Sequence, residues 1–205
     1  MMWKRRFFMY TSKTKNTPVN NLKLFGNIRV LIIAAFLTAL SGAVGKVFSI
    51  DIMPFARIGI ENLPIVMAGI WFGPFVGAAV GFGADYFGCF LKGYAPNPVT
   101  TLGFVAIGFV SGLVSMYMFK TNKTLAVVLA DLAGHIAGSM IIKTIGLYYL
   151  FGGQYPIAIM FAWRIPLYIG IVAVESFLIA IIMKNEAFSR SLDRICNHGK
   201  TRTNA

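Results

Sequence analysis

The chain has 205 residues, of which 57% are hydrophobic and only 13% are charged, and its mean hydropathy is +0.71. A soluble domain would be about half apolar and about a quarter charged, so this composition excludes a soluble protein and indicates one integral membrane domain. The net charge of +12 would suggest a nucleic-acid partner in a soluble protein, but here the basic residues flank apolar runs, and we expect no nucleic-acid binding.

Apolar runs separated by Gly, Pro and charged residues predict an all-α integral membrane protein, a bundle of six transmembrane helices. We place the spans at about residues 28–48, 58–72, 74–91, 99–119, 124–151 and 163–183. The second run is short for a crossing, and a re-entrant helix is the competing interpretation. Outer loops are expected over residues 49–56 and 92–98, and an outer apolar stretch before the sixth span. The membrane domain then covers residues 28–185, between basic segments 1–27 and 186–205.

Most of the 19 basic residues fall on one side of such a bundle, in the two terminal segments and in a middle loop at Lys120 and Lys123. Cytoplasmic loops carry the excess of Lys and Arg, so both termini are predicted to be cytoplasmic. The basic tails would also attract anionic membrane lipids. Cys89 and Cys196 then lie on opposite sides of the membrane, and we expect no disulfide.

Small residues recur at every fourth position on three predicted spans, which lets helix backbones approach closely in lipid. We expect the stripes of the third and fifth spans to pack inside the bundle. For the first span, internal packing and docking of another protein both remain open. The three stripes are Ala35, Ala39 and Ala43; Gly73, Gly77 and Gly81; and Ala130, Gly134 and Gly138.

Ionisable residues within apolar spans are costly in lipid and normally face a partner, a cavity or a substrate. A helix rise of about 1.5 Å per residue places several of them near the outer end of the bundle. We therefore predict a ligand site there, with polar contacts from Arg57, Glu61, Asp85, Asn97, Lys143 and Arg164 and stacking contacts from Tyr148, Trp163 and Tyr168.

This set suits an amphiphilic ligand with a flat hydrogen-bonding ring and a separate anionic end. A carboxylate accepts paired N–H donors from an amino-pyrimidine ring, Arg or Lys holds a ligand carboxylate, and aromatic faces stack on the ring. The alternatives are ion pairs between helices and, for Arg57 and Arg164, simple anchoring at the membrane surface.

Asp131 and His135, spaced by four residues, and Glu175 lie deeper, where they predict either a proton relay or a buried polar pair that sets helix register. Ser139 shares a helix face with His135, but no third group completes a catalytic triad in sequence. No metal-ligand spacing and no phosphate-binding loop is present, so we expect no metal, no cofactor, no enzyme activity and no ATP hydrolysis by this chain.

Three stretches resemble the substrate-binding S components of energy-coupling factor (ECF) vitamin transporters, and most of all the folate-specific FolT members. They are Arg57-Ile-Gly-Ile-Glu61-Asn62-Leu-Pro64-Ile, Gly69-Ile-Trp-Phe-Gly73-Pro74-Phe-Val-Gly77 and Gly81-Phe-Gly-Ala-Asp85-Tyr-Phe-Gly88. Residues 96–103 and Arg164-Ile-Pro166 also fit, and the resemblance covers about residues 28–185.

The resemblance implies a six-helix protein of the prokaryotic plasma membrane that binds folate at its outer face. It also implies two kinds of partner, a transmembrane EcfT scaffold and two ATPase subunits, with the stripe Ala35, Ala39 and Ala43 docking on the scaffold. The alternatives are an S component for another vitamin, a stand-alone proton-coupled transporter and an intramembrane enzyme. A requirement for ATPase partners would distinguish the first class from the second, and turnover by the purified chain would identify the third.

Overall fold

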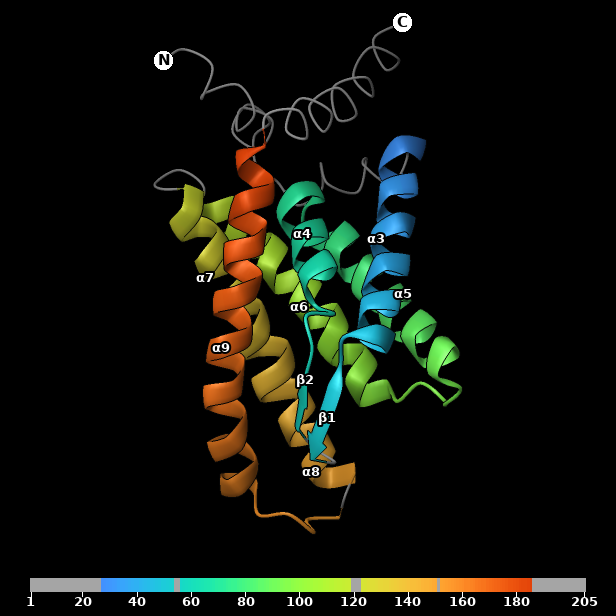
Figure 1. Cartoon of the computed structure of the whole chain (residues 1–205), viewed down its shortest axis with the longest axis vertical. Coiled ribbons are helices and arrows are strands. Elements are labelled where there is room, and N and C mark those ends of the chain that lie inside the picture. The colour runs from blue at the N-terminus through green and yellow to red at the C-terminus, as the bar shows by residue number, and fades with distance from the viewer. Residues whose placement is uncertain (1–26, 54–55, 119–122, 151, 186–205) are drawn as a thin grey trace, which may run out of the picture.

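The structure is a computed structural model that describes residues 27–53, 56–118, 123–150 and 152–185, and it is mostly helical (Figure 1). The predicted basic segments 1–27, apart from Asn27, and 186–205 lie outside the described residues, as does Lys120 of the predicted inner loop. Every described residue except Asn27 belongs to the predicted membrane domain, residues 28–185.

Within the described residues, five helical stretches are long and apolar enough to cross a membrane. They are α3 (Ile28–Val47), α5 (Pro74–Lys92), α6 (Pro98–Met118), the stretch Thr124–Leu150, and α9 (Ile157–Lys184). A shorter apolar helix, α4 (Leu63–Phe72), lies between the first two. Helix α3 begins and helix α9 ends at the same end of the bundle (Figure 1), which requires an even number of crossings. The count of six spans and the cytoplasmic location of that end stay predictions.

A β-hairpin occupies the region predicted as an outer loop. Strands β1 (Ile50–Met53) and β2 (Ala56–Ile58) pair antiparallel, with Ile50 opposite Ile58. The expected outer loop thus contains two strands that the sequence analysis did not predict, although the run Ile50-Asp51-Ile52 alternates apolar and polar residues as a strand does. The hairpin marks one end of the bundle, at the bottom of Figure 1, called the hairpin end below.

Helix α4 begins at Leu63, not at Ile58 as predicted. Pro64 lies in its first turn, where a proline suits the start of a helix because the missing N–H has no partner to lose. Gly73 ends α4 with φ of 92°, which L-residues rarely adopt, and Pro74 starts α5 directly after it. This Gly-Pro turn reverses the chain at the end of the bundle opposite the hairpin.

The fifth and sixth spans also differ from their predicted forms. The fifth consists of α7 (Lys123–His135), a π-helical segment η3 (Ile136–Lys143) and α8 (Thr144–Leu150). The sixth, α9, begins at Ile157 and includes the stretch predicted as a separate outer segment. Arg164 therefore lies about two turns inside the helix, not at its start.

Helix α6 is central to the bundle and contacts α4, α5, α7, η3 and α8. Glycines bring its backbone against its neighbours: a Cβ on Gly77 or Gly81 of α5 would overlap the carbonyl of Gly108 or Phe104, and one on Gly138 would overlap that of Gly103. The prediction that the third- and fifth-span stripes pack internally is confirmed. Close backbone contact is the main attraction between helices in lipid.

Replacing Gly77 with Ala should therefore destabilise the protein by about 1–3 kcal/mol, the usual cost of overpacking. The added methyl group would overlap the Gly108 carbonyl, which belongs to a rigid helix backbone and cannot move away. Thermal unfolding in detergent measures the effect. Gly170→Ala is the matched control, since a Cβ there meets nothing within 4 Å. An equal loss of stability in both variants would contradict this account of the α5–α6 contact.

Candidate functional site

A cavity of about 360 Å³ lies at the hairpin end, enclosed by β2, the last turns of α5, the start of α6, η3 and α9. Its lining is unusually rich in charge for the interior of a membrane domain. Seven of the nine predicted ligand-binding residues line it: Arg57, Glu61, Asp85, Asn97, Lys143, Arg164 and Tyr168. The structure thus brings together side chains from five separate elements of the chain.

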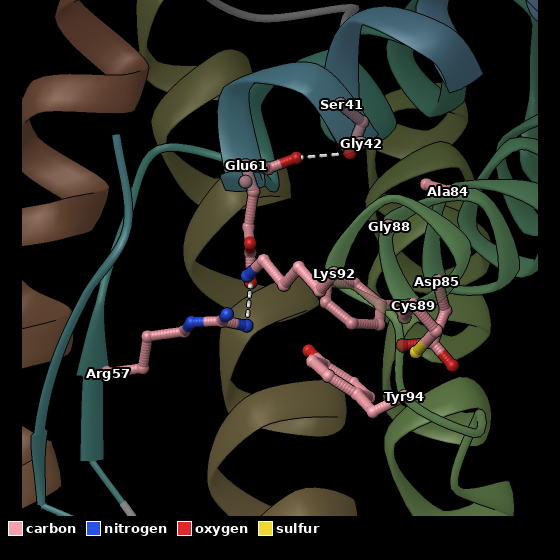
Figure 2. Close-up of a pocket in the computed structure, with 12 residues that line it drawn as sticks. Ser41, Gly42, Arg57, Glu61, Ala84, Asp85, Gly88, Cys89, Lys92 and Tyr94 are labelled. Atoms are coloured by element: carbon pink, nitrogen blue, oxygen red, sulfur yellow. Dashed lines mark hydrogen bonds and ion pairs between the residues drawn. The ribbon is translucent and has the colours of Figure 1, made fainter. Parts of the chain in front are cut away.

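Arg57 and Glu61 stand at the mouth of the cavity and face one another (Figure 2). The Arg57 guanidinium lies 3.5 Å from the Glu61 carboxylate. Ser41 of α3 donates a hydrogen bond of 2.6 Å to the Glu61 backbone carbonyl and so fixes the turn between β2 and α4. Tyr94 completes the mouth from the loop after α5, and partial burial raises the pKa of its phenol.

Asp85 is buried in the wall formed by α5 and accepts a hydrogen bond of 2.5 Å from the Thr101 hydroxyl of α6. Thr101 and Asp85 therefore join the two helices at the cavity. Asn97 lies one turn before Thr101, where its side-chain oxygen accepts from the Val99 backbone N–H at 3.0 Å. The Asn97 side-chain oxygen thus stabilises the start of α6, and its amide nitrogen can donate to a ligand.

Two cations are buried in the opposite wall. Lys143 is only 8% exposed, and its ammonium group lies 3.2 Å from the centre of the Phe104 ring. It makes no ion pair or hydrogen bond with any residue that the structure describes. Its aliphatic stem runs against Gly103, where a Cβ would overlap it. Lys143 is therefore held by carbon contacts and a cation–π contact, and the carboxylates that share the cavity with it, Glu61 and Asp85, form no direct ion pair with it.

Arg164 is 3% exposed and is oriented by hydrogen bonds. It donates 2.7 Å to the Thr144 hydroxyl and 3.4 Å to the Tyr168 hydroxyl, while its buried Nε atom has no hydrogen-bond partner in the described structure. Lys143 and Thr144 are adjacent at the end of the π-helical segment, so this local widening of the helix positions both cations.

The remaining two predicted stacking residues do not line the cavity. Tyr148 packs on a small cluster around Ala56 and Met160, and Trp163 is 51% exposed on the outer surface of α9. Successive helix residues differ in direction by about 100°, so the burial of Arg164 turns Trp163 away from it.

Asn62 is a cavity residue that sequence reasoning did not select for binding. It is 5% exposed, and its side-chain oxygen has no hydrogen-bond partner among the described residues. A buried amide oxygen without a partner is rare because it loses its hydration without compensation. Its position directly before the helix start at Leu63-Pro64 is the feature of the sequence that could have identified Asn62 as a site residue. Tyr94 and Phe104 were likewise not selected.

Asp131, His135 and Glu175 form a separate, fully buried cluster between α7 and α9. His135 Nε2 lies 2.8 Å from Glu175 and 3.5 Å from Asp131, and Ser176 donates 2.8 Å to Asp131. One carboxylate oxygen of Asp131, one of Glu175 and a ring nitrogen of His135, each a possible metal ligand, lie within 4.8 Å of one another. The spacing of these residues along the sequence did not reveal this grouping. These contacts support the interpretation that the cluster sets the register of the two helices.

Glu175 also supplies the third group that the sequence analysis did not find, since Ser139 Oγ lies 3.4 Å from His135 Nδ1. The resulting Ser–His–Glu arrangement is fully buried, and none of its three residues lines the cavity. A nucleophile needs a reachable substrate, so this geometry does not form an active site.

The first-span stripe points away from the bundle. Ala35, Ala39 and Ala43 are all exposed, although α3 packs on α4 and α5 through its other face. These three alanines therefore do not pack inside the bundle, and docking of another protein is the interpretation that remains.

Comparisons with known proteins agree with this architecture. A family model described as "ECF transporter, substrate-specific component" matches residues 29–185. A solved structure described as "Structure and mechanism of the S component of a bacterial ECF transporter" matches with a TM-score of 0.58 and 19% identity, covering 77% of this chain and 95% of that chain. No curated protein matches the chain. With the five apolar helices, these matches show a multi-pass protein of the cell membrane.

Proposed function

The chain belongs to the ECF transporter substrate-specific components, and we propose that it captures folate in the cavity at the hairpin end. The family consists of transporter components, not enzymes. In this proposal an EcfT scaffold and two ATPase subunits provide the energy for uptake, since the chain carries no phosphate-binding loop of its own.

The observation that carries the proposal is the buried ammonium group of Lys143, which lines the cavity without a direct ion pair or hydrogen bond to any described residue. A buried ammonium group without a carboxylate partner is costly at membrane depth and normally marks a substrate site. An anionic ligand would give Lys143 the direct ion pair that the described residues do not provide, and it could accept hydrogen bonds from Arg164. The cavity volume of about 360 Å³ suits a vitamin-sized molecule.

The other groups of the cavity match a flat ring with several donors and acceptors. Asp85 and Glu61 can accept N–H groups of an amino-pyrimidine ring, and the Asn62 side-chain oxygen, which has no partner among the described residues, can accept from a ring edge. Tyr168, a predicted stacking residue, and Phe104 offer aromatic faces to the ring. In this proposal Phe104 has the stacking role that was predicted for Trp163 and Tyr148. Folate combines such a ring with carboxylates, which is why it is preferred over other vitamins.

The test is to purify the chain alone in detergent, identify the co-purifying small molecule by mass spectrometry and titrate the stripped protein with folate by calorimetry. We expect folate to co-purify and to bind at one site per chain. Recovery of a different vitamin would leave the S-component assignment intact and refute folate. Uptake in cells that lack ATPase partners would favour the stand-alone transporter instead.

A further inference from the structure

A second concave region, here called the vestibule, lies directly outside the cavity. It measures about 740 Å³ and shares Met53, Arg57 and Tyr94 with the cavity, so the two spaces adjoin one another. Its other walls come from the end of α3, the hairpin and the end of α5. Any ligand longer than the cavity would extend into it.

Three cations line the vestibule: Lys46, Lys92 and Arg57, of which Arg57 is paired with Glu61. No carboxylate lines it among the described side chains, because Glu61 faces the cavity and the smaller space behind Arg57. Lys92 donates 3.2 Å to the Ser49 hydroxyl, which directs its ammonium group across the vestibule, and Ser49 in turn donates to the Gly45 carbonyl. Lys46 makes no hydrogen bond or ion pair with the described residues.

Like charges that face one space repel each other, so such an arrangement is most stable when an anion occupies it. The cavity already accounts for one anionic group through Lys143 and Arg164. The vestibule therefore adds capacity for further negative charge on the same ligand, at its outward end.

We infer that the vestibule is a subsite for a polyanionic extension of the ligand, a chain that carries two or more carboxylates beyond those held in the cavity. This inference rests on the proposed function, and for a folate it means that γ-linked oligoglutamate forms bind more tightly than the monoglutamate. The cavity then selects the ring, and the vestibule selects the length and charge of the tail.

The experiment compares three probes on the purified full chain in a neutral detergent, so that no anionic lipid competes for the vestibule. The probes are folic acid, pteroyltriglutamate, and a triglutamate analogue of equal length in which the two added residues are glutamine. We expect the triglutamate to bind about tenfold more tightly than folic acid at low salt, since each added carboxylate meets partly exposed cations. The glutamine analogue should bind like folic acid.

The Lys46→Ala and Lys92→Ala double variant should bring the ratio of the two dissociation constants close to one. Lys184→Ala, an exposed lysine at the opposite end of the bundle, is the matched control and should leave the ratio at about ten. Equal affinity of the two folates, or an advantage that survives the double variant, would overturn the vestibule subsite. Failure of all three probes to bind would refute folate itself, and the subsite with it.

Discussion

Replacing Lys143 with Met is expected to remove most of the folate affinity and at the same time to raise the melting temperature of the ligand-free protein. A charged hydrogen bond contributes about 1.5–3 kcal/mol, so the dissociation constant should rise by roughly 10- to 150-fold. The stability gain is expected because the ammonium group is buried without an ion-pair partner in the described structure, whereas a thioether of similar length keeps the contact with Phe104. Calorimetry and thermal unfolding measure the two effects on one preparation.

The opposite directions of the two effects make this test specific. Lys184→Met removes an exposed lysine at the other end of the bundle and should change neither quantity. A Lys143→Met protein that is less stable without ligand would show that Lys143 is structural. Unchanged affinity in a well-folded variant would show that the site lies elsewhere.

The helices of the bundle were predictable because the bilayer imposes their length. The first, third and fourth spans end within two residues of the predicted positions, at Val47, Lys92 and Met118. In each case the sequence has charged, Gly or Pro residues within a few positions after an apolar run of spanning length, and no tertiary information is needed to place the end.

The hairpin and the π-helical segment were not predictable in the same way. The strand β1 has only four residues, and its partner β2 has three, so each depends on the other for its hydrogen bonds. The segment η3 has the same apolar composition as an α-helix, and its wider winding brings Lys143 and Thr144 toward the cavity. Whether this segment forms a π-helix or an α-helix depends on its packing against α6 and α9, and the local sequence does not determine that packing.

The candidate site was largely predictable for an energetic reason. Charged residues in apolar spans must avoid lipid, so Asp85, Lys143 and Arg164 could only face the interior. Aromatic residues carry no such constraint, and the direction of Trp163 depends on the rotation of α9 about its axis. That rotation is set by the burial of Arg164 and Glu175, which became clear only in three dimensions.

The docking stripe leads to the second large effect. Ala39→Trp should abolish assembly with the scaffold and folate uptake while ligand binding by the isolated chain survives. Ala35, Ala39 and Ala43 are exposed on one face of α3. In lipid, close backbone approach supplies the attraction between helices, and an indole on the stripe would hold a partner helix several ångströms away. The substitution cannot disturb the cavity directly, because Ala39 does not line it.

Three measurements on each variant complete the test: co-purification with the scaffold and ATPase subunits, folate uptake by cells, and folate binding by the isolated chain. Leu132→Trp is the matched control, since it adds the same bulk to a lipid-facing position on α7, on the other side of the bundle from α3 (Figure 1). We expect that control to assemble, transport and bind normally. If Ala39→Trp assembles normally, the exposed stripe faces only lipid. If it loses folate binding together with thermal stability, the face of α3 supports the fold, and the scaffold must dock elsewhere.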